Sequence, residues 1–372
     1  MKVTLERSAL LKSLGHVHRV VERRNTIPIL SNVLLRAADQ TLNFKATDLD
    51  LEVVDSTGAD IGQSGATTLP AHTLYEIVRK LPDGAQVSLE LGSNAGQLLL
   101  RSGRSRFTLQ SLPESDFPDI SVGEFDNSFS LAAGDLKKLI DKTQFAISTE
   151  ETRYYLNGIY MHTIDVDGHT MLRAVATDGH RLARVEIPAP TGSAGMPGVI
   201  VPRKAVAELI KLLEETTDDI KVELSATKVR FTVGNVLLTS KLIDGTFPDY
   251  NRVIPANNDK RLVVDCDLFT AAVDRVSTIS SERGRAVKLS LADGKMTLTV
   301  TNPDSGTATE ELEVDYDAAP LEIGFNARYL LDITGQLDSD TALFKLSDSG
   351  SPTIIQDRDG AAALYVLMPM RV

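Results

Sequence analysis

The chain has 372 residues, 42% of them hydrophobic and 24% charged, which is ordinary for a soluble globular protein of two or three domains. A net charge of −12 and a pI near 5.1 argue against a simple basic nucleic-acid binder, so any DNA contact needs a local concentration of positive charge. The single cysteine, Cys266, excludes an intramolecular disulfide and a cysteine-based zinc site, and it fits a reducing cytoplasm. No apolar run is long enough to span a membrane.

Six segments have the apolar spacing of an amphipathic helix. In the first, Leu10, Leu14 and Val17 fall on one face at helical spacing. Proline or a polar residue stands at or near the start of the others. The expected helices are 7–22, 71–81, and segments that begin at or just after Asp135, Pro202, Asp267 and Asn326.

Between these helices lie alternating apolar and polar runs bounded by turn residues, which predict β-strands. Asp178-Gly179, between two such runs, is a strong signal for a tight hairpin. The clearest runs are 33–37, 41–46, 50–54, 86–91, 97–101, 105–110, 159–162, 170–176, 182–187, 219–224, 228–233 and 236–242.

Several short motifs recur along the chain in the same order and at similar intervals, which predicts an internal repeat. The recurring motifs are Thr47-Asp48, Thr177-Asp178 and Thr301-Asn302; Pro70, Pro202 and Asn326; and Phe117-Pro-Asp119 and Phe247-Pro-Asp249. We therefore expect an α+β protein of three homologous domains, each with two helices packed on antiparallel sheets. The expected domains are 1–125, 126–257 and 258–372, with polar linkers near 122–127 and 256–260.

With this repeat in view, the chain resembles the bacterial sliding clamp, the beta subunit of DNA polymerase III, from end to end. The motifs that carry the resemblance are Thr26-Ile-Pro-Ile-Leu30, Arg101-Ser-Gly-Arg-Ser-Arg-Phe107, Arg153-Tyr-Tyr-Leu-Asn-Gly158, 174–182, Val201-Pro-Arg-Lys204, Phe247-Pro-Asp-Tyr250 and Tyr365-Val-Leu-Met-Pro-Met-Arg-Val372. The resemblance implies a head-to-tail homodimeric ring of six similar domains, with helices inside, sheets outside and duplex DNA through the hole.

The same resemblance implies the function of a cytoplasmic DNA polymerase processivity factor, which does no chemistry itself. Its implied partners are a second copy of the chain, double-stranded DNA without sequence preference, the replicative polymerase, an ATP-driven clamp loader, repair polymerases and mismatch-repair proteins. No membrane association is implied.

The number of helices gives an independent test of whether one chain or two would be needed to encircle DNA. Six helices packed about 10 Å apart close a circle with only about 9 Å clear inside, too narrow for a duplex of about 20 Å. Twelve helices leave about 28 Å clear. One chain therefore cannot encircle DNA, whereas two chains can, through a heterologous contact that closes by geometry.

Basic residues on the expected inner helices would contact phosphates weakly and without base readout, as sliding requires. The alternative for each is the ordinary solvated face of an amphipathic helix. Two tyrosines are implied by the resemblance alone; beside them this chain has Glu150 where the family can carry an amide. The candidate DNA-contacting residues are Arg24, Arg79, Lys138, Lys142, Tyr154, Tyr155, Arg203 and Lys204.

The family binds partners through a short peptide with apolar and aromatic anchors, held in a cleft. Leucine and valine walls with methionines suit an adaptable apolar slot, although Leu156, Val366 and Met368 could equally be ordinary core. By resemblance, the cleft residues are Leu156, Thr177, Gly179, His180, Arg181, Leu182, Pro248, Arg252, Val253, Val366, Met368, Pro369, Met370 and Arg371.

The dimer interface is also given by resemblance. Phe107 and Leu109 of one subunit would meet Thr278 and Ile279 of the other, with Arg104 and Arg106 facing acidic residues such as Glu310. Thr278 is a weak apolar partner, which predicts a ring that opens more readily than those of relatives.

Two alternatives belong to other functional classes. An enzyme built on Asp178, His180 and Arg181 lacks any nucleophile or nucleotide-binding motif, and a lone histidine on a turn is more often a surface residue. The segment 165–176 begins like a calcium loop but ends in alanine, which favours a hairpin turn. A sequence-specific DNA-binding protein is disfavoured by the acidic pI. We expect no catalytic residue, metal or cofactor.

Overall fold

The computed structural model describes residues 1–92, 96–120, 123–280 and 286–372, so position 122, where the first expected linker begins, lies outside the described residues. By its internal contacts the chain divides into two units. Unit 1 comprises Met1–Leu136, Pro190–Met196 and Lys204–Leu242; unit 2 comprises Lys137–Ala189, Pro197–Arg203 and Ile243–Val372. In the described residues no helix is both long and apolar enough to cross a membrane.

The described residues contain six α-helices, and they lie at the six places that the sequence predicts. They are α1 (Arg7–Val17), α2 (Ala71–Lys80), α3 (Ala133–Asp141), α4 (Arg203–Leu213), α5 (Cys266–Ser277) and α6 (Ala327–Thr334). The first is shorter than the predicted 7–22, because the chain tightens at His18–Val20 into a 3-10 turn. There the Leu14 carbonyl accepts the backbone amide of His18, and Nδ1 of the same residue lies 2.8 Å from it.

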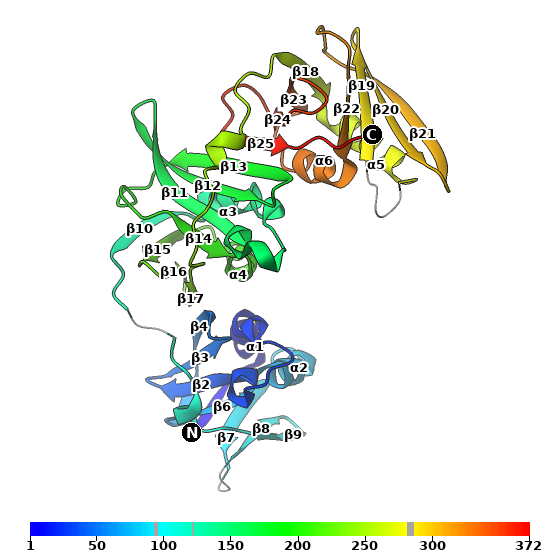
Figure 1. Ribbon diagram of the computed structural model, residues 1–372. Helices are drawn as coiled ribbons and strands as arrows, with labels where there is room; N and C mark the ends of the chain where they lie inside the picture. The colour runs from blue at the N-terminus through cyan, green and yellow to red at the C-terminus, as the bar shows by residue number, and fades with distance from the viewer. Residues whose placement is uncertain (93–95, 121–122, 281–285) are drawn as a thin grey trace. The chain divides into compact units, whose positions relative to one another are not determined.

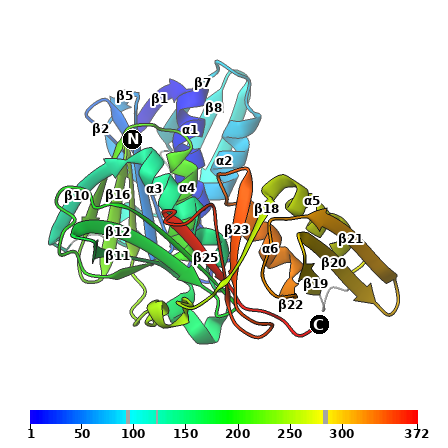
Figure 2. The same cartoon turned by 90° about the horizontal axis from the view of Figure 1, so that it is seen from above.

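Unit 1 contains two antiparallel sheets, one of five strands in the order β5-β1-β7-β8-β9 and one of eight in the order β10-β15-β16-β17-β4-β3-β2-β6. Helices α1 and α2 pack against each other beside them (Figures 1 and 2). The strands are β1 (Lys2–Glu6), β2 (Asn32–Ala38), β3 (Thr41–Thr47), β4 (Leu51–Gly58), β5 (Asp60–Gln63), β6 (Gly65–Pro70), β7 (Gln86–Leu91), β8 (Gln97–Ser102), β9 (Ser105–Gln110), β10 (Asn127–Ala132), β15 (Asp219–Leu224), β16 (Lys228–Val233) and β17 (Val236–Lys241).

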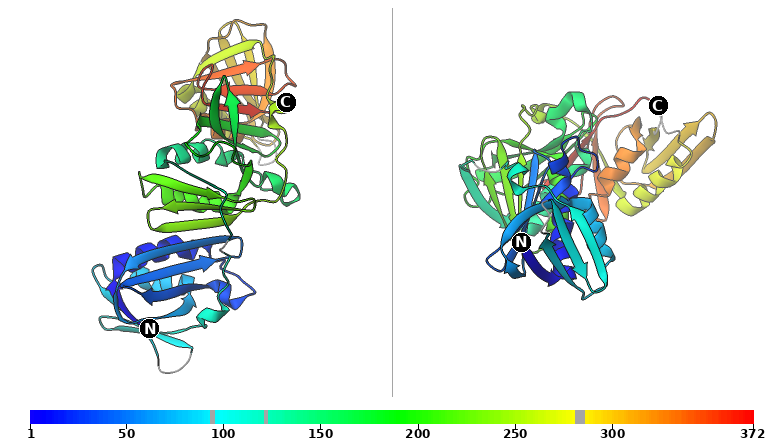
Figure 3. Two further views of the ribbon diagram at one scale, coloured as in Figure 1. Left: turned by 90° about the vertical axis from the view of Figure 1, so that its left-hand side faces the viewer. Right: turned by 90° about the horizontal axis from the view of Figure 1, so that it is seen from below.

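Unit 2 also contains two antiparallel sheets, in the orders β14-β11-β12-β13-β25-β24-β23-β18 and β21-β20-β19-β22. The paired helices α5 and α6 pack along the four-stranded sheet, as the orange and yellow ribbons of Figure 3 show. The strands are β11 (Gly158–Val166), β12 (His169–Thr177), β13 (Arg181–Pro188), β14 (Val199–Pro202), β18 (Lys260–Asp265), β19 (Ala286–Ala292), β20 (Lys295–Asn302), β21 (Gly306–Glu313), β22 (Leu321–Asn326), β23 (Thr341–Leu346), β24 (Thr353–Gln356) and β25 (Ala363–Leu367).

Each strand run predicted from the alternating pattern corresponds to an observed strand. The strands β1, β5, β6 and β14 were not among the predicted runs; β5 and β14 form by pairing with the distant strands β1 and β11. The segment 165–176 is a hairpin, as predicted. Its turn residues Asp167 and Gly168 have φ of 49° and 81°, the left-handed conformation that a two-residue β-turn of this hand requires.

The repeated Thr-Asp motifs form the same turn twice. In unit 1, Asp48 Oδ1 accepts hydrogen bonds from the amides of Asp50 and Leu51, and Thr47 Oγ1 donates to the Leu51 carbonyl. In unit 2, Asp178 Oδ1 accepts from the amides two and three residues on, and Thr177 Oγ1 donates to a carbonyl four residues on. The predicted repeat is therefore a repeat of backbone geometry as well as of sequence.

Candidate peptide site and nucleic-acid contacts

Two neighbouring strands of unit 2 bring the predicted cleft residues together. Strands β13 and β25 pair antiparallel with Leu182 opposite Val366, and both side chains are only 2% exposed. They belong to one buried apolar cluster, which we call the 182/366 cluster. Its members are Leu156, Val175, Leu182, Ile200, Phe247, Tyr250, Ile354, Leu364 and Val366.

Burial separates the predicted apolar residues into a floor and a rim. Three of them are buried core residues: Leu156, Leu182 and Val366. The alternative that Leu156 and Val366 are ordinary core is therefore confirmed, and these residues can form only the buried floor beneath a surface site. Met368 is 40% exposed and Val253 is 49% exposed, although both are apolar. Met368 follows Val366 of the cluster by two residues, and Val253 precedes Ile254, which packs against the cluster.

The C-terminal tail is fixed at two points rather than frayed. The Met368 amide donates to the His180 carbonyl at 2.9 Å, and the Met370 amide donates to the Gly324 carbonyl at 2.8 Å. Only Pro369 lies between these two anchors, and its ring restricts φ. The tail is therefore held beside the 182/366 cluster by backbone hydrogen bonds.

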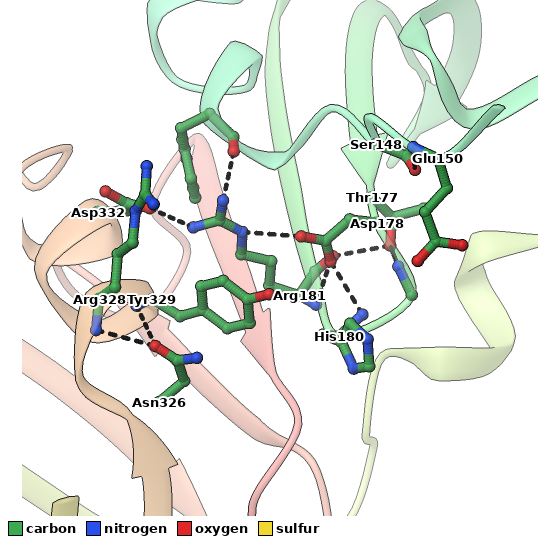
Figure 4. Close-up of polar contacts among 12 residues, drawn as sticks. Ser148, Glu150, Thr177, Asp178, His180, Arg181, Asn326, Arg328, Tyr329 and Asp332 are labelled. Carbon is green, nitrogen blue, oxygen red and sulfur yellow. Dashed lines mark hydrogen bonds and ion pairs between the residues drawn. The ribbon is translucent and has the colours of Figure 1, made fainter. Parts of the chain in front are cut away.

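Arg181 organises the polar end of the site instead of facing a partner. Its guanidinium pairs with Asp332 at 2.5 Å and Asp178 at 3.2 Å, and it lies 4.2 Å from the ring centre of Tyr329 (Figure 4). Its remaining nitrogen donates to the Phe145 carbonyl at 2.7 Å. These contacts occupy all three nitrogens of the guanidinium, whereas His180 is exposed.

Helix α6 supplies residues that sequence reasoning missed. Asn326 Oδ1 accepts from the amides of Arg328 and Tyr329 and so caps the helix, and the Tyr329 ring lies 6.5 Å from that of His180 (Figure 4). The signal for Asn326 was present, since it is one of the repeated motif positions. Nothing local marked Tyr329 or Asp332, because their neighbours come from a segment about 150 residues away.

Arg153 was also missed, although it begins one of the quoted motifs. Its guanidinium lies against Gly179, where an added Cβ would stand 2.5 Å from Nη1, so a side chain there would push the arginine aside. Gly179 also has φ of 88°, which favours glycine for a second reason. Arg153 pairs with Glu150 through contacts of 2.8 and 2.6 Å.

This ion pair changes the electrostatics around Glu150. Hydrogen bonds from Arg153 lower the pKa of the Glu150 carboxyl, so it stays ionised, and the paired cation offsets its charge. The neighbouring tyrosine rings meet edge to face at 5.8 Å, and Tyr154 is 53% exposed. The charge of Glu150 is therefore paired, whereas the exposed Glu151 begins the 3-10 helix that carries the two tyrosines.

The loop residues Pro248, Arg252 and Val253 flank an anchored tyrosine. Tyr250 is 5% exposed; its hydroxyl lies 3.0 Å from Nη1 of Arg173 and 2.9 Å from Nε2 of His162. Arg252 pairs with Asp249, three residues earlier, at 3.0 Å, and its side chain is 84% exposed. The loop is thus fixed at Tyr250 and leaves Arg252 and Val253 at the surface.

The predicted DNA-contacting residues differ in how freely they present charge. Arg24, Lys138 and Arg203 are exposed. Lys142 is 9% exposed, and its ammonium group contacts the Gln336 carbonyl and Asp338, so its charge points inward. The other two cations are shared with carboxylates: Arg79 with Glu76 at 2.7 Å, and Lys204 with Glu22 and Asp48 at 2.5 Å each.

The predicted interface residues lie on or near strands that end a sheet. Phe107 and Leu109 belong to β9, an edge strand of unit 1. Thr278 and Ile279 follow α5 in unit 2, where β21 is also an edge strand. Both arginines are exposed: Arg106 lies in β9, and Arg104 directly precedes it. Glu310 already pairs with Arg275 of its own chain at 2.5 Å.

Three family models match the chain in sequence. They describe the N-terminal, central and C-terminal domains of the DNA polymerase III beta subunit and match residues 1–121, 130–249 and 251–371. The chain belongs to this family of sliding clamps. As a member it has the clamp fold and the role of a processivity factor in DNA replication.

Individual sliding clamps agree along their whole length. The chain is 57% identical to the beta sliding clamp of Caulobacter vibrioides and 42% identical to that of Escherichia coli K12, with all of each chain covered. Among solved structures, the sliding clamp of Bartonella birtlesii bound to griselimycin has a TM-score of 0.97 and 58% identity, with both chains fully covered. A Caulobacter crescentus clamp has a TM-score of 0.98 and 57% identity, covering 100% of this chain and 99% of the other.

Proposed function

We propose that two copies of this chain form a head-to-tail ring around duplex DNA and tether partner proteins through a peptide site at the 182/366 cluster. The observation that supports the peptide site most strongly is the juxtaposition of a buried apolar floor with the exposed Met368 and Val253. A peptide with apolar and aromatic anchors would cover these side chains, while the exposed His180 would meet its polar groups.

The proposed ring joins two edge strands. Strand β9 of one copy would add to β21 of the next, since each ends its own sheet with unpaired backbone groups. Because the two surfaces differ, the contact is heterologous and must close into a ring rather than extend into a filament. For this contact Glu310 would have to be shared between Arg275 and an arginine of the other copy. We also propose the three domain boundaries given above.

DNA contact is proposed for the exposed cations and Tyr154. Arg24, Lys138 and Arg203 are free to meet phosphates, whereas Arg79 and Lys204 would first have to exchange carboxylate partners. Lys142 is the weakest of the eight candidates, since it is held at Asp338. Such contacts are weak and independent of sequence, which suits a ring retained by its topology.

We further propose that the chain acts without catalysis, in the cytoplasm, with the replicative polymerase, an ATP-driven loader, repair polymerases and mismatch-repair proteins as partners. The Asp178, His180 and Arg181 group has a structural explanation that needs no reaction. Asp178 organises a turn, and Arg181 joins that turn to α6. A catalytic group would need a free base or nucleophile among these residues.

The ring is tested by retention on DNA after loading, with a nicked circle compared with the same molecule cut once. Protein that stays on the circle and slides off the linear form is linked topologically. Equal retention on both forms would instead mean that contacts hold the protein, and the ring would be rejected. The peptide site is tested separately by fluorescence anisotropy with a labelled peptide that carries leucine and phenylalanine anchors.

A further inference from the structure

Gly324 in strand β22 lies where the C-terminal tail comes closest to a neighbouring backbone. The Met370 amide donates to the Gly324 carbonyl at 2.8 Å. A Cβ added at Gly324 would stand 2.6 Å from the Met370 carbonyl oxygen and 2.3 Å from Cγ1 of Val372. Real Cβ contacts are essentially never so short, so any side chain here forces the tail to move.

The backbone conformation does not explain this glycine. Gly324 is not among the residues of positive φ, so a side chain is compatible with its local geometry. The internal repeat gives two equivalent positions with which Gly324 can be compared. Gly324 lies two residues before Asn326, as Thr68 lies before Pro70 and Ile200 before Pro202. The first two are β-branched residues in strands, so the strand itself tolerates a side chain.

The three equivalent positions each contact a later segment of the chain. The Thr68 amide donates to the Leu112 carbonyl at 3.2 Å, and the Ile200 carbonyl accepts from the Ile243 amide at 3.0 Å. At these two positions a side chain fits beside the crossing segment. The first and third repeats form the same kind of antiparallel bridge, Thr68 with Leu112 and Gly324 with Met370, yet only in the third is the residue a glycine whose added Cβ would meet the crossing backbone at 2.6 Å.

The tail transmits this contact to the candidate peptide site. Met368 is fixed to the His180 carbonyl and Met370 to the Gly324 carbonyl, with Pro369 between them. A shift at Met370 is therefore passed on to Met368, because the single residue between them has a restricted φ and leaves few backbone torsions to absorb it. Val372 is 64% exposed, so its side chain can rotate away from an added Cβ. The contact that would force the tail to move is therefore the one with the Met370 carbonyl oxygen.

The tail also has space to move into. Its last residues, Met370 to Val372, border a groove of about 710 Å³ against the four-stranded sheet, lined among others by Lys288, Thr299 and Glu322. A tail lifted from β22 can thus take another path without unfolding its sheet.

We infer that Gly324 is a positioning residue for the peptide site: it seats the C-terminal tail on β22 and so holds Met368 at the rim of the 182/366 cluster. The effect on the tail stands on the contacts above, whereas the effect on binding rests on the proposed peptide site. Gly324 itself would not touch the peptide.

The test compares Gly324→Ala with Gly350→Ala, a matched control at an exposed glycine where an added Cβ comes no closer than 3.6 Å to Asp348. Amide hydrogen exchange of residues 368–372 reports the seat directly, and anisotropy with a fluorescein-labelled peptide carrying leucine and phenylalanine anchors reports binding. We expect Gly324→Ala to speed tail exchange at least tenfold and to weaken peptide binding at least tenfold. Its melting temperature and its retention on circular DNA should match those of the control.

A truncated chain separates positioning from general damage. In a chain that lacks residues 369–372, Gly324→Ala should change peptide affinity no further, because the segment through which it acts is gone. An equal loss in the truncated chain, unchanged tail exchange, or faster exchange with unchanged affinity would each overturn the inference. If the peptide fails to bind even the wild-type chain, the proposed peptide site is rejected, while the exchange data still test whether Gly324 seats the tail.

Discussion

The same sheet junction occurs in both units, but it is apolar in unit 2 and charged in unit 1. In unit 2, Leu182 pairs with Val366 across β13 and β25; in unit 1, Glu52 pairs with Thr239 across β4 and β17. Both pairs lie next to a Thr-Asp turn. The Met368–His180 backbone hydrogen bond of unit 2 has its equivalent in a bond from the Lys241 amide to the Asp50 carbonyl.

The difference extends to the neighbouring positions. Val175 in unit 2 corresponds to Lys45 in unit 1, and Ile354 corresponds to Arg230, as the strand pairings show. The resulting groove of about 440 Å³ in unit 1 is lined by Lys45, Glu52 and Arg230 among others. One backbone plan thus yields an apolar cluster in one unit and an ionic cluster in the other, and only the apolar one suits a peptide with leucine and phenylalanine anchors.

The largest effect is expected when the apolar junction of unit 2 is given a charged residue like that of unit 1. Leu182→Glu places a carboxylate in the 182/366 cluster with no cation beside it, whereas Glu52 in unit 1 has Lys45 at 2.9 Å. We expect the free energy of unfolding to fall by about 3–5 kcal/mol, measured by urea denaturation, and peptide binding to disappear. Leu182→Met is the control, and it should cost less than about 1.5 kcal/mol. A Leu182→Glu variant as stable as wild type would refute this account.

The second test removes the cation of the ionic cluster. Lys45→Met leaves Glu52, which is 3% exposed, without its partner. Burial alone would lower the pKa of Lys45, but bonds to Asp119 and Glu52 raise it, so the ammonium is the charged partner that the cluster needs. We expect a loss of about 3 kcal/mol in unfolding free energy, recovered largely in Lys45→Met/Glu52→Leu, where no charge is left buried. A double variant less stable than the single one would contradict this.

A third test uses pH. In unit 1, Nδ1 of His16 lies 2.8 Å from Asp55 and Nε2 lies 3.1 Å from Glu215. Burial opposes the charge on His16, but these two carboxylates raise its pKa overall. A raised pKa stabilises the fold fully below the unfolded value of about 6.5, and this stabilisation is lost as pH rises through the folded pKa.

We therefore expect wild type to exceed His16→Gln in stability by about 1–2 kcal/mol at pH 5.5, with the difference shrinking above the folded pKa. Thermal unfolding at a series of pH values measures this difference, and one that grows with pH would reverse the assigned sign. Leu182→Met supplies the contrast, because its unfolding midpoint relative to wild type should not change with pH over the same range.

The smallest expected effect on stability is at the rim of the apolar junction. Met368→Ala removes a side chain that is already 40% exposed, so unfolding free energy should change by less than about 0.5 kcal/mol. Peptide affinity should nevertheless fall several-fold, because the apolar rim is lost on one side. Its counterpart Lys241→Ala in unit 1 should leave peptide affinity unchanged. Equal losses in both variants would remove the distinction between the two junctions.

Much of the secondary structure in both units could be predicted from the sequence alone. Helical spacing and strand alternation predicted all six helices and most of the long strands, because these signals are local and need no knowledge of neighbours. Asp178-Gly179 predicted its hairpin because a left-handed glycine after an aspartate specifies such a turn. The short strands β5 and β14 were missed because each depends on pairing with a distant strand for its stability.

The site divides in the same way. Its apolar and turn residues were named from motifs, and burial then separated the floor, Leu182 and Val366, from the exposed Met368. Arg181 was named as a possible peptide contact, but its guanidinium is occupied by Asp332 and Tyr329 of α6. A pairing across about 150 residues leaves no local pattern, so no reading of the motif could have found it.

The elements, the repeat and the family could all be predicted from the sequence, since short motifs and their intervals encode them. Which charged side chains are paired and which are exposed became clear from the tertiary structure: Lys142 contacts Asp338, Glu150 is paired with Arg153, and Arg24 is exposed. It also decided that Gly324 matters through a tail nearly fifty residues further along the chain. Charge pairing and close approach depend on distances in space, which local sequence patterns do not carry.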